Sequence, residues 1–178
     1  FIFAASFFLF ALIHASELPD TEAVPLRGDL PELVLPTEPL PEMVRRVSKD
    51  HGIPFAFVDA LITVESRWNP EAINFNKSPD LKKADHGLMQ INFRTASRLG
   101  VSDWKELHAN PEENVVLGHR VISECYDLAV RNKLPSQKEK WRFTAACYNA
   151  GPGNWRAGLP HAEKVLKVME AKLFEELV

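Results

Sequence analysis

The sequence has few of the residues that bind metals or form disulfide networks. Its only two cysteines, Cys125 and Cys147, do not form a CxxC pair, and no two histidines have the spacing of zinc ligands. We therefore expect no metal site and no cofactor. Internal repeats and long strand-like alternations are also absent, which argues against repeat architectures and against an extensive sheet.

Neither sign of charge predominates in the sequence. The 178 residues contain 21 Lys and Arg against 24 Asp and Glu, a net charge of −3. Residues 16–42 hold seven of the acids and one base, and residues 1–15 hold neither, so residues 43–178 contain 20 bases and 17 acids, a net charge of +3. Since there is no basic stripe, we expect no nucleic-acid partner. A slight positive excess would suit an anionic polymer but does not identify one.

The apolar run at the start, residues 1–13, is too short to cross a bilayer, which takes about 20 residues. It is typical of the h-region of a secretory signal peptide whose basic n-region is missing, with cleavage after Ala15. The alternative is the end of an N-terminal membrane helix that tethers the protein. No cysteine follows the run, which argues against a lipoprotein anchor.

The next segment, residues 16–42, has six prolines among its acids and predicts an extended linker. Residues 43–178 are enough for one domain with its own core. Helix start and stop signals are frequent there: Pro54 suits a first helical position, Asn69-Pro70 a helix end, and Asn110 and Ser136 are typical N-caps. The predicted helices are 43–50, 55–67, 95–99, one opened by Pro111, one from Ser136 toward Tyr148, and 162–175. The prediction is a mainly α domain with a small irregular or β flap near residues 69–92.

Three short motifs stand in fixed order in this domain: Glu65-Ser66, the segment from Gly87 to Asn92 (Gly-Leu-Met-Gln-Ile-Asn), and Tyr148-Asn149-Ala150-Gly151. Together they resemble the lysozyme-like lytic transglycosylases, which cut the glycan strands of bacterial peptidoglycan. The resemblance runs over roughly residues 43–170, and it implies an α+β lysozyme-like fold, a peptidoglycan substrate and a periplasmic location.

Glu65 is the candidate catalytic acid. It shares a helical face with Val58 and Leu61, and it stands at the negative end of the helix dipole. Removal from water and the dipole both favour the neutral carboxyl, the form that donates a proton. The resemblance implies that this glutamate protonates the oxygen between N-acetylmuramic acid and N-acetylglucosamine. It then deprotonates the C6 hydroxyl, which closes on C1 as a 1,6-anhydro end without consuming water.

Asp85 leaves two interpretations open. The segment from Asp85 to Asn92 also resembles the part of animal-type lysozymes that carries their second catalytic carboxylate. Asp85 either supports the reaction, by stabilising positive charge or holding the loop, or it completes the carboxylate pair of a hydrolase.

The remaining candidate residues surround this carboxyl chemistry. We expect Tyr148 to hydrogen-bond Glu65, Gln90 to contact an N-acetyl group, and Gly87 to let the backbone approach the sugar. Asn149 either contacts an N-acetyl group or caps the turn. Met89 either meets a sugar ring or packs in the core. The full set of substrate-binding or supporting candidates is Ser66, Asp85, Gly87, Met89, Gln90, Asn92, Tyr148 and Asn149.

The start of the final helix departs from the family pattern, and the state of the two cysteines is undecided by the sequence. Many relatives place a Glu-Thr pair and then a tyrosine at the start of the final helix, where this chain has Leu159-Pro160-His161. His161 either replaces the tyrosine ring or is a solvated helix-start residue. Cys125 and Cys147 lie on helices expected to pack together, and in an exported protein they form either a disulfide or two buried thiols.

The first function hypothesis is therefore a monomeric lytic transglycosylase similar to the small enzymes that accompany secretion systems and pili. The second is a hydrolase that uses Glu65 and Asp85. The third is a non-catalytic module for cell-wall binding or assembly, although a pure binder would not need a poised acid.

Overall fold

The computed structural model describes residues 30–76 and 79–175. The predicted signal peptide, and the predicted linker up to residue 29, lie outside the described residues. The described part contains no helix long and apolar enough to span a bilayer. Its elements in chain order are α1 (Leu40–Asp50), α2 (Phe55–Glu65), β1 (Ile73–Asn74), η2 (Leu81–Lys83), β2 (Asp85–His86), β3 (Ile91–Asn92), α3 (Phe93–Arg98), α4 (Trp104–Ala109), α5 (Pro111–Arg131), α6 (Gln137–Ala150), η3 (Pro152–Gly158) and α7 (Leu159–Glu175).

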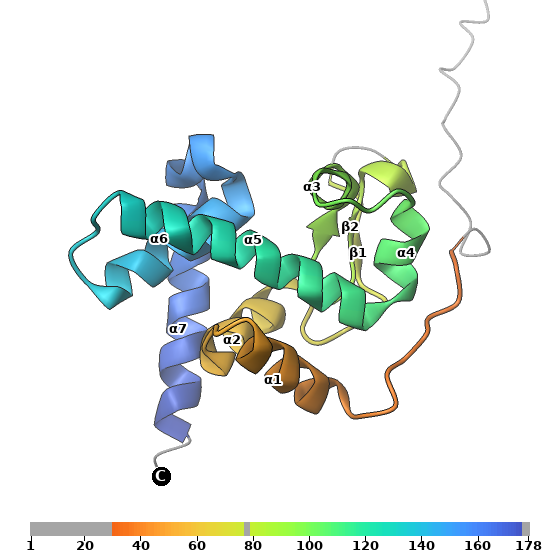
Figure 1. Ribbon diagram of the computed structural model, residues 1–178, viewed down its shortest axis with the longest axis horizontal. Coiled ribbons are helices and arrows are strands. Elements are labelled where there is room, and N and C mark those ends of the chain that lie inside the picture. Colours follow the sequence, from red (N-terminus) through yellow and green to blue (C-terminus); the bar gives the residue numbers. More distant parts are fainter. Residues whose placement is uncertain (1–29, 77–78, 176–178) are drawn as a thin grey trace, which may run out of the picture.

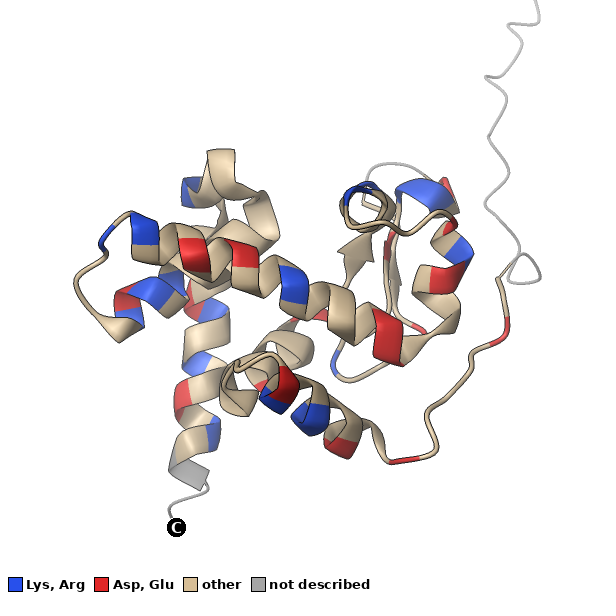
Figure 2. Ribbon diagram, in the orientation of Figure 1, with Lys and Arg blue, Asp and Glu red and all other residues tan. Residues whose placement is uncertain are grey.

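The longest helix, α5, connects the two halves of the domain (Figure 1). One end lies beside the sheet, α3 and α4, and the other packs on α6. Its start agrees with the sequence prediction: Asn110 Oδ1 accepts the backbone N–H of Glu113 at 3.1 Å, and Pro111 occupies the first turn. Acidic and basic residues are interspersed along it, so it carries no single-sign stripe (Figure 2).

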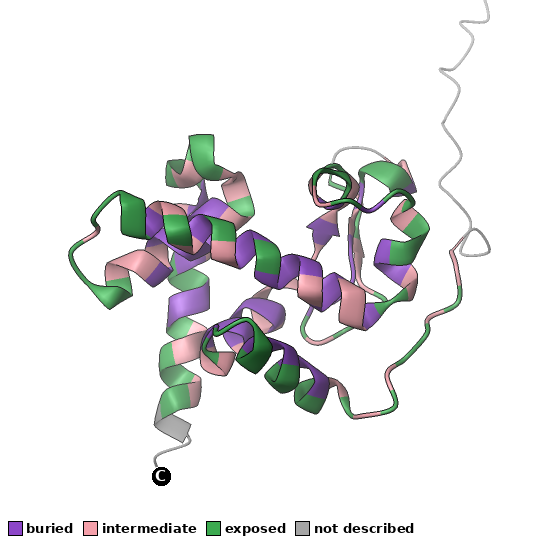
Figure 3. Ribbon diagram, viewed as in Figure 1, coloured by how far each residue is buried: buried purple, intermediate pink, exposed green. Residues whose placement is uncertain are grey.

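Helix α2 lies in the core and carries Glu65 as its last residue. Phe57, Leu61 and Ile62 are fully buried, and each such side chain contributes roughly 1.5–3 kcal/mol of hydrophobic stabilisation. Helix α1 covers α2 with one buried face and shows its charged face to solvent (Figure 3). The predicted end of α2 at Arg67 was wrong. The helix stops at Glu65 because Arg67 and Trp68 take left-handed backbone angles, with φ of 55° and 63°.

The three strands form an antiparallel sheet in the order β1-β2-β3, with Ile73 paired to His86 and Asp85 paired to Asn92. This confirms the predicted fold class, a mainly α domain with a small flap. The buried side chain of Asn114 on α5 joins the flap to the helices. Its Oδ1 accepts the N–H of Met89 at 2.9 Å, and its Nδ2 donates to the carbonyl of His86 at 2.8 Å.

Several predicted helix starts were also displaced. Helix α1 begins at Leu40, inside the predicted linker, and α7 begins at Leu159, three residues before the predicted start. In both cases prolines lie in the first helical turn, which tolerates them because its N–H groups have no helical acceptor. Pro54 is the N-cap of α2 rather than its first residue. Helix α4 was not predicted, although Asp103 caps it by accepting the N–H of Lys105 at 3.0 Å.

Candidate active site

A cavity of about 490 Å³ opens between the two halves of the domain. It is walled by the end of α2, the sheet, α3, the middle of α5 and the junction of α6 with η3. Six of the predicted site residues line it: Glu65, Asp85, Gln90, Asn92, Tyr148 and Asn149. Ser66, Gly87 and Met89 lie outside its lining. The structure thus brings together residues from all three sequence motifs.

Glu65 is partly withdrawn from water, with 15% of its side chain exposed. The side chain that approaches it is His161 in the first turn of α7, whose Nε2 lies 3.2 Å from Glu65 Oε1. His161 is 14% exposed, so it is not a solvated helix-start residue. The distance is that of a hydrogen bond, but the present angles do not complete one, and Nε2 is a buried atom without an aligned partner.

Tyr148 does not make the hydrogen bond to Glu65 that the sequence suggested. Its hydroxyl donates instead to the backbone carbonyl of Met89 at 2.6 Å. Burial of the phenol, and then the negative charges of Glu65 and Asp85, raise the pKa of Tyr148 well above its usual value. The hydroxyl therefore keeps its proton and ties α6 to the flap beside Glu65.

Asp85 is held by amides on both of its oxygens. Asn76 Nδ2 donates to Oδ2 at 2.8 Å, and Asn92 Nδ2 donates to Oδ1 at 3.1 Å. Asn92 also caps α3 by accepting the N–H of Arg94 at 2.9 Å. Asn92 consequently fixes both a carboxylate and a helix start, and its side chain is occupied by these contacts.

Gln90 has a left-handed backbone, with φ of 46°, and its side chain folds back on the flap. Its Nε2 donates to the carbonyls of Ala72 at 3.0 Å and Gly87 at 2.9 Å. The amide nitrogen is therefore committed within the protein, and the side-chain oxygen is the group that Gln90 can offer to a ligand.

The three predicted residues outside the lining have structural surroundings. Met89 is fully buried, and a Cβ added at Gly118 of α5 would lie 2.6 Å from its thioether sulfur. Of the two interpretations of Met89, the structure has core packing. Gly87, with φ of +74°, faces the Asn114 side chain, where an added Cβ would approach to 2.6 Å, so its close contact is with protein. Ser66 Oγ donates to the carbonyl of Ile62 at 3.3 Å at the end of α2.

Comparison with known proteins gives a decisive match. The family model for the transglycosylase SLT domain matches residues 42–166, which contain all three motifs. The chain belongs to this family.

Two curated relatives and one solved structure are similar to parts of this chain. Over 128 residues the chain is 30% identical to the membrane-bound lytic murein transglycosylase F of Stutzerimonas stutzeri (strain A1501), covering 72% of this chain and 22% of that protein. It is 30% identical over 125 residues to the soluble lytic murein transglycosylase of Escherichia coli (strain K12), covering 66% of this chain and 17% of the relative. A solved structure, the 70 kDa soluble lytic transglycosylase SLT70 from Escherichia coli, matches with a TM-score of 0.48 and 21% identity, over 73% of this chain and 21% of that one. The chain spans about a fifth of the length of these relatives.

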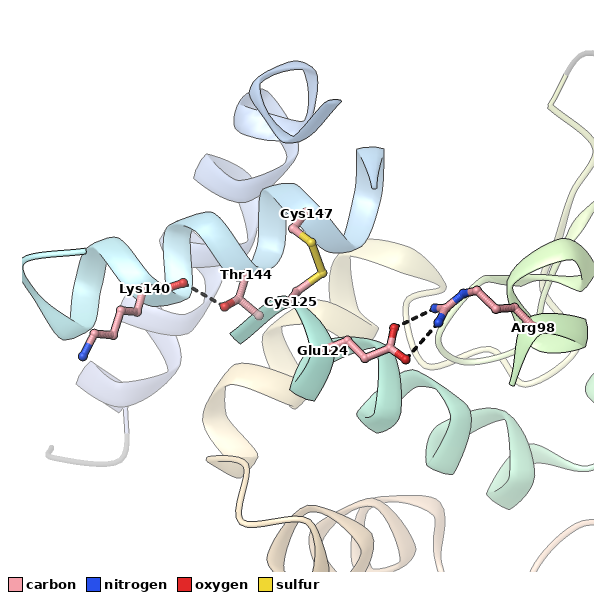
Figure 4. The surroundings of a disulfide bond; sticks show 6 residues. All are labelled: Arg98, Glu124, Cys125, Lys140, Thr144 and Cys147. Carbon is pink, nitrogen blue, oxygen red and sulfur yellow. Dashed lines mark hydrogen bonds and ion pairs between the residues drawn. A yellow bond between two sulfur atoms is a disulfide. The ribbon is translucent and has the colours of Figure 1, made fainter. Parts of the chain in front are cut away.

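This SLT domain also has cavity residues that the sequence motifs did not indicate. Arg98 on α3 and Glu124 on α5 both line the cavity and form a bidentate ion pair, with N–O distances of 2.9 and 2.7 Å (Figure 4). The hydrogen bond from Arg98 is the main cause that lowers the pKa of Glu124. The two residues are 26 positions apart on separate helices, so no local pattern could have predicted the pair.

The two cysteines form a disulfide between α5 and α6, and both line the cavity (Figure 4). Of the two alternatives that the sequence left open, a disulfide or two buried thiols, the structure has the disulfide. Among residues 30–76 and 79–175 no cluster of three His, Cys, Asp or Glu side chains has the geometry of a metal site.

Proposed function

We propose that this SLT-family chain is a peptidoglycan lytic transglycosylase in which Glu65 carries both proton transfers. As a carboxylic acid, Glu65 donates its proton to the oxygen between N-acetylmuramic acid and N-acetylglucosamine. As the resulting carboxylate, it takes the proton of the muramyl C6 hydroxyl, which bonds to C1 and closes the 1,6-anhydro ring. The proton and bond balance closes without water, so a single carboxyl group suffices.

The observation that carries the proposal is the position of Glu65. Its side chain is 15% exposed, and the residue ends an apolar helix and lines the cavity. Tyr148 and Asp85 lie along the same cavity with their hydrogen bonds directed to protein groups.

A hydrolase is the second candidate, and Asp85 is the observation that favours it. Asp85 lines the same cavity as Glu65, and amides held on both oxygens keep the carboxylate oriented. An oriented anion there would stabilise an oxocarbenium-like centre in either reaction. Only a role in activating water, or in covalent attack on C1, would make Asp85 part of a hydrolytic pair.

Digestion of purified peptidoglycan, with mass spectrometry of the released muropeptides, separates these candidates. Products one water lighter, with 1,6-anhydromuramyl ends, support the transglycosylase. Ordinary reducing ends favour the hydrolase. No release by folded protein favours the binding module.

The matched variants are Glu65→Gln and Glu106→Gln. We expect Glu65→Gln to lower cleavage about 100-fold or more, since positioned general acids contribute about 10²–10⁴-fold. Binding to insoluble peptidoglycan should persist in this variant. Glu106 is an exposed glutamate on α4 outside the cavity lining, so Glu106→Gln should cleave as the wild type does. Equal activity of both variants would contradict the role of Glu65.

The setting of the activity follows from the same proposal. We place the protein outside the cytoplasm at the cell wall, where its substrate lies, delivered by the apolar N-terminal run. Local opening of the wall for a secretion or pilus apparatus is the role that the family resemblance suggests. Release of this protein together with a periplasmic marker during osmotic shock, while a cytoplasmic marker stays in the cells, would support this location, and its retention with the cytoplasmic marker would contradict it.

A further inference from the structure

Helices α2 and α7 pack against each other, with the C-terminal end of α2 beside the first turn of α7. At one end His161 meets Glu65, and at the other Lys172 Nζ lies 2.5 Å from Asp59 Oδ1 and 3.1 Å from Thr63 Oγ1. Two contacts separated by three turns of α7 fix the register of the helix pair. The His161 side chain is therefore held against the carboxyl by the fold and not by its own rotamer preference alone.

Two polar side chains that line the cavity with Glu65 already donate their protons to backbone carbonyls. The single hydroxyl proton of Tyr148 goes to the Met89 carbonyl, and the amide nitrogen of Gln90 goes to two carbonyls of the flap. Asp85 is itself an acceptor. Within the part of the chain that the structure describes, His161 makes the only ion-pair contact with the Glu65 carboxyl, and no side chain there completes a hydrogen bond to it. His161 is therefore the described side chain that lies closest to giving this carboxyl an orienting hydrogen bond.

We propose that His161 is the positioning residue of Glu65, an inference that rests on the proposed transglycosylase function. The neutral imidazole, protonated at Nε2, donates to Oε1 once a small rotation aligns the pair. Oε1 then remains the acceptor in both states of the carboxyl. The other oxygen, Oε2, carries the transferable proton, first toward the glycosidic oxygen and then from the C6 hydroxyl.

A neutral donor suits both steps of this reaction. A fixed positive charge at 3.2 Å would hold Glu65 as the carboxylate and remove the acid needed for the first step. A neutral N–H orients the acid without that penalty, and it stabilises the carboxylate that forms between the two transfers. Orientation matters because a catalytic group must stay within hydrogen-bond reach of its proton.

The test compares His161→Phe, His161→Gln and the control His51→Gln in the full chain. Phenylalanine keeps an aromatic ring but has no donor, whereas glutamine keeps an N–H donor. His51 is an exposed histidine after α1 that lies outside the cavity lining. Rates of anhydromuropeptide release are measured on soluble, uncrosslinked glycan strands, to separate kcat from KM. Thermal unfolding checks that each variant folds.

We expect His161→Phe to lower kcat on the order of 10- to 100-fold, the usual cost of losing a hydrogen bond to a charged group, with KM within about twofold. His161→Gln should recover most of that loss, and His51→Gln should match the wild type. A purely structural role would not be rescued by a smaller side chain with a donor. Wild-type kcat in His161→Phe, or no rescue by glutamine, would overturn the inference.

A second readout does not depend on activity. With ¹³C-labelled glutamate carboxyls, the Glu65 signal is assigned by its loss in Glu65→Gln. We expect this signal to move in His161→Phe and to stay in place in His51→Gln. An unmoved signal overturns the positioning inference even if the wild type is active. Absence of anhydro products from the wild type, together with a moved signal, would refute the proposed function and leave the contact supported.

Discussion

The disulfide between Cys125 and Cys147 allows the stability of the domain to be tested without changing its sequence. It joins α5 to α6, and both cysteines are buried in a small apolar cluster with Ala129 and Phe143. Reduction replaces one S–S bond by two thiols and changes no other covalent bond. Any change in the free energy of unfolding therefore reports on the cross-link.

The size of the effect follows from the loop that the bond closes. The two cysteines are 22 residues apart. Loop-closure entropy for about 22 residues is roughly 11 cal/mol/K, which is about 3 kcal/mol at 25 °C. For a chain of this size, about 3 kcal/mol corresponds to roughly 6–12 °C in melting temperature. Reduction should therefore lower the free energy of unfolding, and it should leave the cleavage rate unchanged at temperatures well below the melting temperature.

Urea unfolding with and without reductant measures this difference, and thiol alkylation with mass spectrometry counts free cysteines in each sample. Since the chain has only two cysteines, the assignment is unambiguous. A Cys125→Ala, Cys147→Ala double variant is the control, because its midpoint must not respond to reductant. Two free thiols in the untreated protein, or identical midpoints for the oxidised and reduced forms, would refute the reasoning.

Three further predictions concern side chains that join elements. Asn114→Ala should lower the free energy of unfolding by roughly 3 kcal/mol, because it leaves the buried N–H of Met89 and carbonyl of His86 unpaired. Urea unfolding measures this loss, and a value under about 1 kcal/mol would contradict the importance of these two hydrogen bonds. Burial lowers the pKa of His119 from 6.5 to about 4. Because the unfolded chain then binds the proton more readily than the folded one, the free energy of unfolding should fall by about 3 kcal/mol as pH drops from 6.5 to 4, and His119→Gln should flatten this slope. Lys172→Met removes a half-buried ion pair to Asp59 and should lower the free energy of unfolding by about 1 kcal/mol in the same assay. No loss would mean that apolar packing alone holds α7 and would contradict this prediction.

The sequence predicted local features well where one residue decides the outcome. The N-cap of α5 by Asn110 and the N-cap of α6 by Ser136 were predicted from residue type alone. A capping side chain acts on backbone groups two or three residues away, so its evidence lies within one short window. The same locality explains the error at Pro54 and the displaced starts of α1 and α7, because a proline at a helix start is compatible with more than one position.

Partners that are far apart in the sequence were harder to predict. The motifs placed Glu65 and Tyr148 at the same site, but they could not show that the tyrosine donates to Met89 while His161 approaches the glutamate. The ion pair of Arg98 with Glu124 was missed for the same reason. These contacts depend on how helices rotate against one another, and composition, capping signals and periodicity carry no information on that rotation.

The hydrogen bonds around the cavity give a physical reason to assign the chemistry to Glu65 rather than to its neighbours. Asp85 accepts an amide on each oxygen, and the hydroxyl of Tyr148 is occupied by a backbone carbonyl. To transfer its proton, Tyr148 would first have to give up the hydrogen bond that ties α6 to the flap, and the two amides hold the Asp85 carboxyl in one orientation. Among the side chains that the structure describes, His161 alone makes an ion-pair contact with the Glu65 carboxyl, on one oxygen, and that contact is not fully aligned. A carboxyl that is sheltered but lightly bonded can gain and lose a proton without disturbing the fold, and this is the property that a group acting as acid and then as base requires.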